Sequence, residues 1–160
     1  MEPEEPAPAW QPPQTLLYLL KRAHLAARAL ADDALAASGM SVAEYAVLRR
    51  LEEAPGLSGA ELARRCFVTA PTINGLLTGL EQSGLIERLP DPQGGRCILA
   101  RLTPRGEGAV TKAHLTVDRL EELLFADIDS ATQDQLRDAL ATIAGNADAV
   151  RLGTTVGARV

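Results

Sequence analysis

The stretch from Leu57 to Gly106 constrains the fold most, because its local signals change from helix to strand and back to helix within a short length of chain. Residues 58–61 have the Ser-x-x-Glu form of a capping box, which predicts that a helix begins there. The run Cys66-Phe67-Val68 has poor helix propensity and predicts the end of that helix. Between these signals, Leu62 is expected to face inward.

A second helix is predicted from residue 69 to residue 83. Thr69 is a suitable N-cap, and Pro71 fits the first turn, where its missing amide hydrogen costs nothing. Ser83-Gly84 predicts the end of this helix, since glycine is common just past a helix. The apolar positions recur at helical spacing and form one stripe: Ile73, Leu76, Leu77 and Leu80.

After Gly84 the pattern becomes that of strands. Residues 85–89 alternate in part and predict one strand, and residues 96–102 predict the return strand. The residues between them are rich in proline and glycine, which indicates a loop. Thr103-Pro104 then predicts another helix, with threonine as cap and proline in the first turn. Two short helices followed by a hairpin outline a winged helix-turn-helix, a DNA-reading module.

At this point the sequence resembles the multiple-antibiotic-resistance regulator (MarR) family of bacterial repressors. The resemblance rests on residues 80–86 (LEQSGLI), the loop 90–92 (PDP), the wing residue Arg96 and the closing residues 102–106 (LTPRG). It extends upstream through residues 40–48 (MSVAEYAVL). Two positions depart from the family pattern. Gly94 stands where the wing usually has aspartate, and Gly75 stands where the reading helix often has a basic residue.

The expected fold class is mainly α with a small β-wing, a winged helix-turn-helix flanked by dimerisation helices. The family fold also implies a short third strand at Leu57. We expect residues 14–40 and 104–152 to form the helical dimerisation region and residues 41–103 to form the DNA-binding region. The proline-rich, acidic residues 1–13 are expected to be a disordered tail, and residues 153–160 a frayed end. A capping-box pattern, Ser130-x-x-Gln133, predicts the start of the last helix.

Length and charge agree with this organisation. The chain has 160 residues, enough for one domain with a real core, and no run long enough to span a membrane. No signal peptide is visible, so a cytoplasmic protein is expected. The net charge is −5, yet residues 58–105 carry +2 while the flanking parts carry −3 and −4. Because phosphate contacts need local positive charge only, this asymmetry favours double-stranded DNA as a partner.

Candidate DNA contacts follow from the proposed module. Thr72 and Asn74 are the candidates for base edges, since asparagine pairs with adenine and threonine contacts the thymine methyl group. The alternative is that both lie on a solvated helix face. Arg96 is the candidate for a flanking minor groove. The other candidates are phosphate contacts or neighbours on the reading helix: Ser58, Arg64, Arg65, Thr69, Ala70 and Arg88.

Other sites are less marked. The resemblance implies a pocket for a small aromatic ligand between the dimer base and the reading module, and Tyr18, His24, Arg28 and Tyr45 are the candidates; ordinary packing or exposure is the alternative for each. Cys66 and Cys97 are either a redox pair or small hydrophobic residues, and free cysteine is more often the latter.

No cofactor, metal site or enzymatic constellation is predicted. The two histidines, His24 and His114, are far apart in the sequence and lack companion ligands. The chain also lacks a phosphate loop and a nucleophile elbow.

The sequence therefore predicts a homodimeric, sequence-specific transcription regulator, a ligand-responsive repressor that binds a near-palindromic operator. One alternative is a winged-helix protein-interaction module without operator binding, because no Lys or Arg lies between Val68 and Glu81. The other alternative is a thiol-based redox-sensing repressor.

Overall fold

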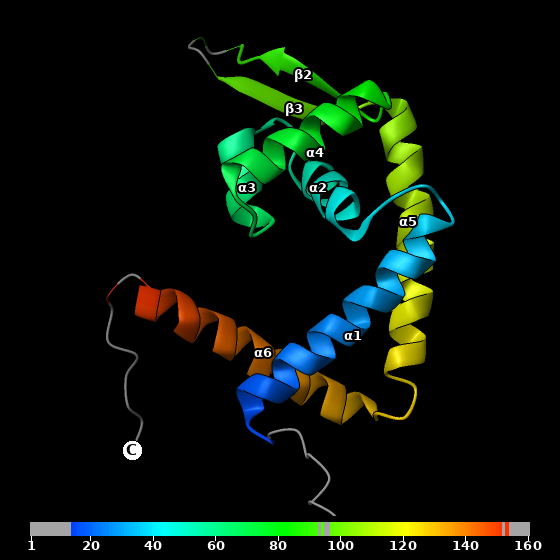
Figure 1. Cartoon of the computed structure of the whole chain (residues 1–160), viewed down its shortest axis with the longest axis vertical. Helices are drawn as coiled ribbons and strands as arrows, with labels where there is room; N and C mark the ends of the chain where they lie inside the picture. The colour runs from blue at the N-terminus through cyan, green and yellow to red at the C-terminus, as the bar shows by residue number, and fades with distance from the viewer. Residues whose placement is uncertain (1–13, 93, 95–96, 152, 154–160) are drawn as a thin grey trace, which may run out of the picture. The chain divides into compact units, whose positions relative to one another are not determined.

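The computed structural model describes residues 14–92, 94, 97–151 and 153 (Figure 1). The predicted N-terminal tail, the wing residue Arg96 and most of the predicted C-terminal end lie outside these residues. The chain divides into two compact units, residues 1–120 and residues 121–160. The first unit holds the predicted reading module.

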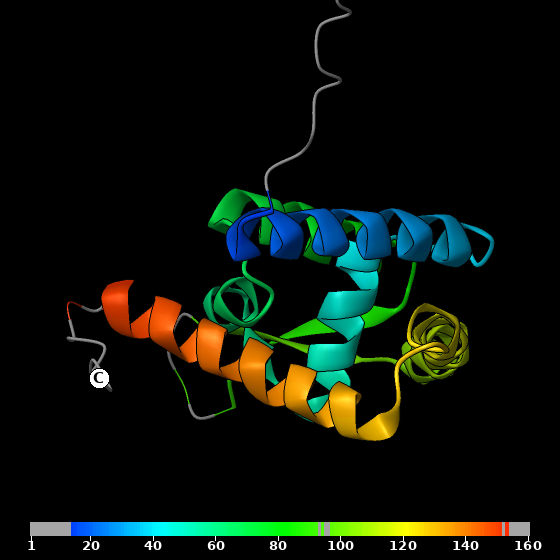
Figure 2. The ribbon, with the colours of Figure 1, turned by 90° about the horizontal axis from the view of Figure 1, so that it is seen from below.

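Two helices open the described chain. Helix α1 (Leu16–Ala36) begins at Thr15, whose hydroxyl oxygen accepts a hydrogen bond from the amide of Tyr18 at 3.4 Å. Helix α2 (Val42–Glu53) begins with a complete capping box between Ser41 and Glu44, as their spacing indicates. Figure 2 shows α2 crossing α1 steeply, and the two helices are in contact.

The helix-turn-helix is formed as the sequence predicts. Helix α3 (Gly59–Arg65) starts at the capping box of Ser58 and Glu61, and helix α4 (Ala70–Gln82) starts at the N-cap Thr69. Between them, Phe67 has a φ of +56°, which is uncommon for a residue other than glycine. Its side chain is 83% exposed.

Three antiparallel strands form a small sheet in the order β1-β3-β2. They are β1 (Leu57–Ser58), β2 (Ile86–Pro90) and β3 (Ile98–Leu102). The strand expected at Leu57 is confirmed, since Leu57 pairs with Ala100. The hairpin strands begin slightly later in the chain than predicted, and they stand beside α4 and α2 (Figure 1).

A tight junction joins the sheet to helix α5 (Pro104–Leu124). Gly84 ends the α4 turn with a φ of +70°, and its carbonyl accepts a hydrogen bond from the Thr103 hydroxyl at 2.7 Å. The same hydroxyl oxygen accepts from the amide of Gly106 at 3.1 Å. Gly106 is buried so closely that an added Cβ would lie 2.0 Å from the carbonyl oxygen of Leu85.

The core of the first unit joins one side chain from α1 to residues of α2, α3, α4, the sheet and α5. Helices α2 and α4 contribute the apolar faces that their sequence spacing predicts, whereas α1 contributes Leu35 alone. The side chains that are almost completely excluded from solvent are Leu35, Val47, Leu48, Leu51, Leu62, Ile73, Leu80 and Val110.

The second unit contains the end of α5 and helix α6 (Ser130–Arg151). The predicted cap at Ser130 is wrong: Ser130 lies inside the helix, and Asp129 accepts the hydrogen bond from the amide of Thr132 at 3.0 Å. The side-chain amide of Gln133 donates to the carbonyl of Ile128 at 2.8 Å instead of closing a capping box. No residue of α6 is buried within the part of the chain described.

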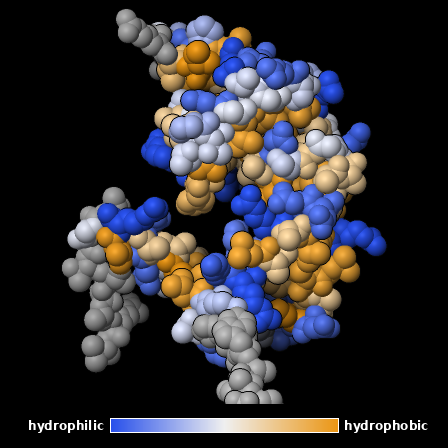
Figure 3. All heavy atoms as spheres, in the orientation of Figure 1, coloured by the Kyte–Doolittle hydropathy of each residue, from blue (hydrophilic) through white to orange (hydrophobic). Residues whose placement is uncertain are grey.

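Hydrophobic side chains remain exposed along the helices outside the reading module (Figure 3). On α1 they include Leu16, Leu17, Leu25 and Leu30, and on α6 they include Leu136, Leu140, Ile143 and Val150.

Candidate nucleic-acid interface

Helix α4 has two distinct faces. Three residues of the predicted stripe, Ile73, Leu77 and Leu80, are at most 3% exposed. The fourth, Leu76, is half-buried against the same core. Between residues 69 and 78, the exposed positions form an uncharged surface with several polar side chains. Its exposed residues are Thr69, Ala70, Pro71, Thr72, Asn74, Gly75 and Thr78.

The N-terminal end of α4 is organised by side-chain hydrogen bonds. The hydroxyl oxygens of Thr69 and Thr72 lie 2.8 Å apart, and the Thr69 hydroxyl oxygen also accepts from the amide of Thr72 at 3.4 Å. The side-chain oxygen of Asn74 lies near the start of α3, 3.8 Å from where a Cβ on Gly59 would stand. Thr72 and Asn74 are therefore both exposed, Thr72 beside the N-cap of its own helix and Asn74 near the start of α3.

Helix α3 presents Arg64 and Arg65 to solvent at its C-terminal end. At its other end, the Ser58 hydroxyl donates to the Glu61 carboxylate at 2.6 Å. This hydrogen bond, followed by the one from the Ser58 amide, lowers the pKa of Glu61. The Ser58 side chain thus caps the helix, and any phosphate contact by it would be additional to that role.

Arg88 is held by a partner that the sequence analysis did not identify. Its Nε donates to Glu81 Oε2 at 2.8 Å, and its Nη2 contacts the same oxygen. The hydrogen bond lowers the pKa of Glu81 and raises that of Arg88. This pair joins β2 to the end of α4, so a phosphate at Arg88 would share the guanidinium with Glu81.

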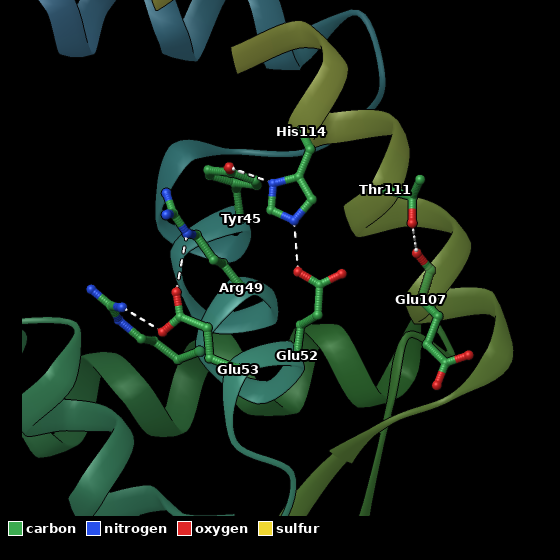
Figure 4. A network of polar contacts seen from close by, with 8 residues as sticks. Tyr45, Arg49, Glu52, Glu53, Glu107, Thr111 and His114 are labelled. Atoms are coloured by element: carbon green, nitrogen blue, oxygen red, sulfur yellow. Dashed lines mark hydrogen bonds and ion pairs between the residues drawn. The ribbon is translucent and has the colours of Figure 1, made fainter. Parts of the chain in front are cut away.

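Tyr45, His114 and Glu52 form a network between α2 and α5 (Figure 4). The Tyr45 hydroxyl lies 2.9 Å from His114 Nδ1, and His114 Nε2 lies 2.6 Å from Glu52 Oε2. The two rings meet edge to face with their centroids 5.6 Å apart. The His114 tautomer that donates from Nε2 to the Glu52 carboxylate leaves Nδ1 to accept from the Tyr45 hydroxyl.

The predicted ligand-pocket residues are not joined into one cluster. Tyr18 is half-buried on α1, while His24 and Arg28 are exposed on the same helix, where Arg28 pairs with Asp32 at 3.6 Å. Tyr45 is 8% exposed and contacts α5. Burial raises the pKa of Tyr45, and the nearby Arg49 opposes this shift.

Both cysteines are free thiols. Cys66 is half-buried, and burial raises its pKa, which disfavours the reactive thiolate. Cys97 is exposed. Among the described residues there is no cluster of three or more metal-binding side chains, and no described helix has the length and hydropathy needed to cross a membrane.

Comparison with known proteins decides the family. Residues 38–96 match a model of the MarR family. The chain is 33% identical over 123 residues to the HTH-type transcriptional repressor Rv2887 of Mycobacterium tuberculosis, covering 77% of this chain and 88% of that repressor. The chain belongs to the MarR family.

Solved structures of other MarR-family proteins resemble this one closely. The M. tuberculosis Rv2887 complex with salicylic acid has a TM-score of 0.68 and 32% identity, covering 82% of this chain and 97% of that one. The transcriptional repressor CouR bound to a 23-mer DNA duplex has a TM-score of 0.77 and 30% identity, covering 82% and 93%. The winged helix-turn-helix predicted for this MarR-family chain is therefore confirmed.

Proposed function

We propose that this protein is a homodimeric transcription repressor that binds a near-palindromic operator and releases it when a small aromatic acid binds. The observation that carries the proposal is the uncharged polar face of α4 on a MarR-family scaffold. A major groove admits a helix, and such a face offers hydrogen bonds and methyl groups to base edges.

The proposed contacts divide by role. Thr72 and Asn74 approach base edges, with Thr69 and Ala70 beside them at the start of the helix. Arg64 and Arg65 approach phosphates, Ser58 and Arg88 can add contacts beyond their present partners, and Arg96 reaches a minor groove. The CouR structure, which is bound to a DNA duplex, supports the proposed DNA binding. The Rv2887 structure, which is bound to salicylic acid, supports the proposed binding of an aromatic acid.

Exposed apolar surface on the terminal helices supports the dimer. Helix α6 has 22 residues and buries none of them within the described chain, although Leu136, Leu140 and Ile143 recur at helical spacing. Helices with one apolar face are stabilised by burying that face. A second copy of the chain would cover these side chains and those of α1.

Two-fold symmetry gives the operator its form. Two α4 helices would enter successive major grooves, so the half-sites are expected about 34–36 Å apart, one helical turn of DNA. The two α4 helices of one dimer conformation match the spacing of the half-sites, and those of another do not. An aromatic acid that binds the second conformation more tightly would lower the population of dimers able to bind DNA.

The test is selection of binding sites from random duplexes with the purified protein, followed by operator titration at several salt concentrations. Asn74→Ala should weaken operator binding by about 1–3 kcal/mol and relax the preference at one base position. Arg65→Ala should weaken binding to all DNA sequences by a similar factor. It should also lower the salt slope, the slope of log affinity against log salt concentration, by about one.

Gln82→Ala, an exposed change at the far end of α4, is the matched control and should bind as the wild type does. Recovery of no preferred sequence would refute the proposal and favour a protein-interaction module. Sedimentation at micromolar concentration tests the dimer, and a well-folded monomer there would contradict it.

A further inference from the structure

A cavity of about 450 Å³ that is open to solvent on one side lies beside the reading module, and nothing in the proposed function uses it. It is bounded by the turn between α1 and α2, the C-terminal end of α4 and the first turns of α5. Its lining includes Ser38, Met40, Ser83, Leu85, Arg105 and Lys112. None of the four predicted ligand-pocket residues lines it.

Glycines supply much of the space. Gly79 of α4 and Gly108 of α5 both line the cavity, and a Cβ added to either one would meet no atom within 4 Å. The volume falls within the range of ordinary small-molecule sites, which is about 300–1,000 Å³.

The charge of the lining indicates the class of ligand. Neither the guanidinium of Arg105 nor the ammonium of Lys112 has an ion pair or hydrogen bond within the described chain. The one acidic lining residue, Glu44, already accepts two hydrogen bonds from Ser41, each at 2.8 Å. Both cations are exposed and can meet an anion, and Ser41 holds the Glu44 carboxylate, which keeps its negative charge.

The spacing of the cations indicates the length of that ligand. Arg105 and Lys112 lie seven residues apart on α5, which corresponds to about 10.5 Å along a helix. Met40, Leu85 and Ala109 add apolar lining. We propose that this cavity binds an elongated organic dianion, with one acidic group at Arg105, the other at Lys112 and an apolar segment between them.

Arg105 alone has a simpler explanation, because its Nη1 lies 3.8 Å from where a Cβ on Gly84 would stand, just past the end of α4. A cation there interacts favourably with the helix dipole. That role explains neither Lys112 nor the open space at Gly108. Measurement separates the two roles of Arg105. A contact with the helix dipole would affect the stability of the fold only, whereas a contact with a ligand would affect the ligand affinity.

The test is calorimetric titration of the full chain with suberate, which carries a carboxylate at each end of a methylene chain. Octanoate, with one carboxylate, is the matched ligand. We expect one molecule of suberate to bind per chain. Arg105→Gln and Lys112→Gln should each lower the affinity for suberate about fivefold to tenfold. The affinity for octanoate should be lower than that for suberate by a similar factor. Only one of the two substitutions should lower the affinity for octanoate further.

Two further variants keep the result interpretable. Arg119→Gln removes an exposed cation from the same helix outside the cavity lining and should leave suberate binding unchanged. Gly108→Leu should fill the cavity and abolish binding without lowering the melting temperature, because leucine has the higher helix propensity. Absence of suberate binding, an equal loss in Arg119→Gln, or full binding by Gly108→Leu would each overturn the proposal. These measurements contain no DNA, so their failure is separate from failure of the proposed function.

Discussion

Substitution of Gly106 by alanine tests the junction that attaches the wing to α5. The added Cβ would lie 2.0 Å from the carbonyl oxygen of Leu85 and 3.0 Å from its carbonyl carbon. Real Cβ atoms essentially never approach another atom closer than 3.0 Å, so one backbone must move by about 1 Å. Both obstructing atoms are backbone, so no side-chain rotation relieves the contact.

The energy follows from three contributions. Overpacking of this kind costs about 1–3 kcal/mol. Moving the Leu85 carbonyl also weakens the 3.1 Å hydrogen bond that it accepts from the amide of Thr103, which contributes about 1 kcal/mol. Alanine returns about 1 kcal/mol through its higher helix propensity. Gly106→Ala should therefore lower the free energy of unfolding by about 1–3 kcal/mol.

Gly108→Ala is the matched control, because it makes the same change two residues further along α5, where nothing lies within 4 Å of the new Cβ. It should raise the free energy of unfolding by about 0.5–1 kcal/mol. Urea unfolding at one fixed protein concentration measures both variants, since the stability of a dimer depends on concentration. Equal stability of the two variants would refute the close packing at Gly106.

Three more predictions concern the network, the thiols and the wing. Burial raises the pKa of Tyr45 above 10.0, so the neutral phenol stabilises the fold below that pH and this stability is lost as the pH rises through the folded-state pKa. Urea unfolding between about pH 9 and pH 11 should show a larger loss for the wild type than for Tyr45→Phe, and equal losses would contradict this. Burial disfavours the Cys66 thiolate, so peroxide should have the same effect on operator binding in the wild type and in the double variant Cys66→Ser, Cys97→Ser. An operator-release assay measures this effect. Release by peroxide in the wild type alone would establish a thiol switch. Arg96→Ala should weaken operator binding by about 1–3 kcal/mol and lower the salt slope by about one in the same titration, and an unchanged slope would remove this arginine from the interface.

Local interactions were readable from the sequence. The caps at Ser41, Ser58 and Thr69 involve residues within one turn of each other, so the residue types and their spacing are sufficient to predict them. The buried stripe of α4 follows from helical periodicity in the same way. The error at Ser130 has a local reason as well, since Asp129 is a neighbouring and equally suitable cap.

Contacts between distant parts of the chain required the tertiary structure. His114 meets residues 69 and 62 positions away, Tyr45 and Glu52, and no local pattern marks such pairs. The pairing of Arg88 with Glu81 depends on how β2 leaves the end of α4. The cavity at Arg105 and Lys112 depends on three elements meeting around small residues. Periodicity determines which face of each element is apolar, whereas packing between elements determines which polar side chains meet and where space remains.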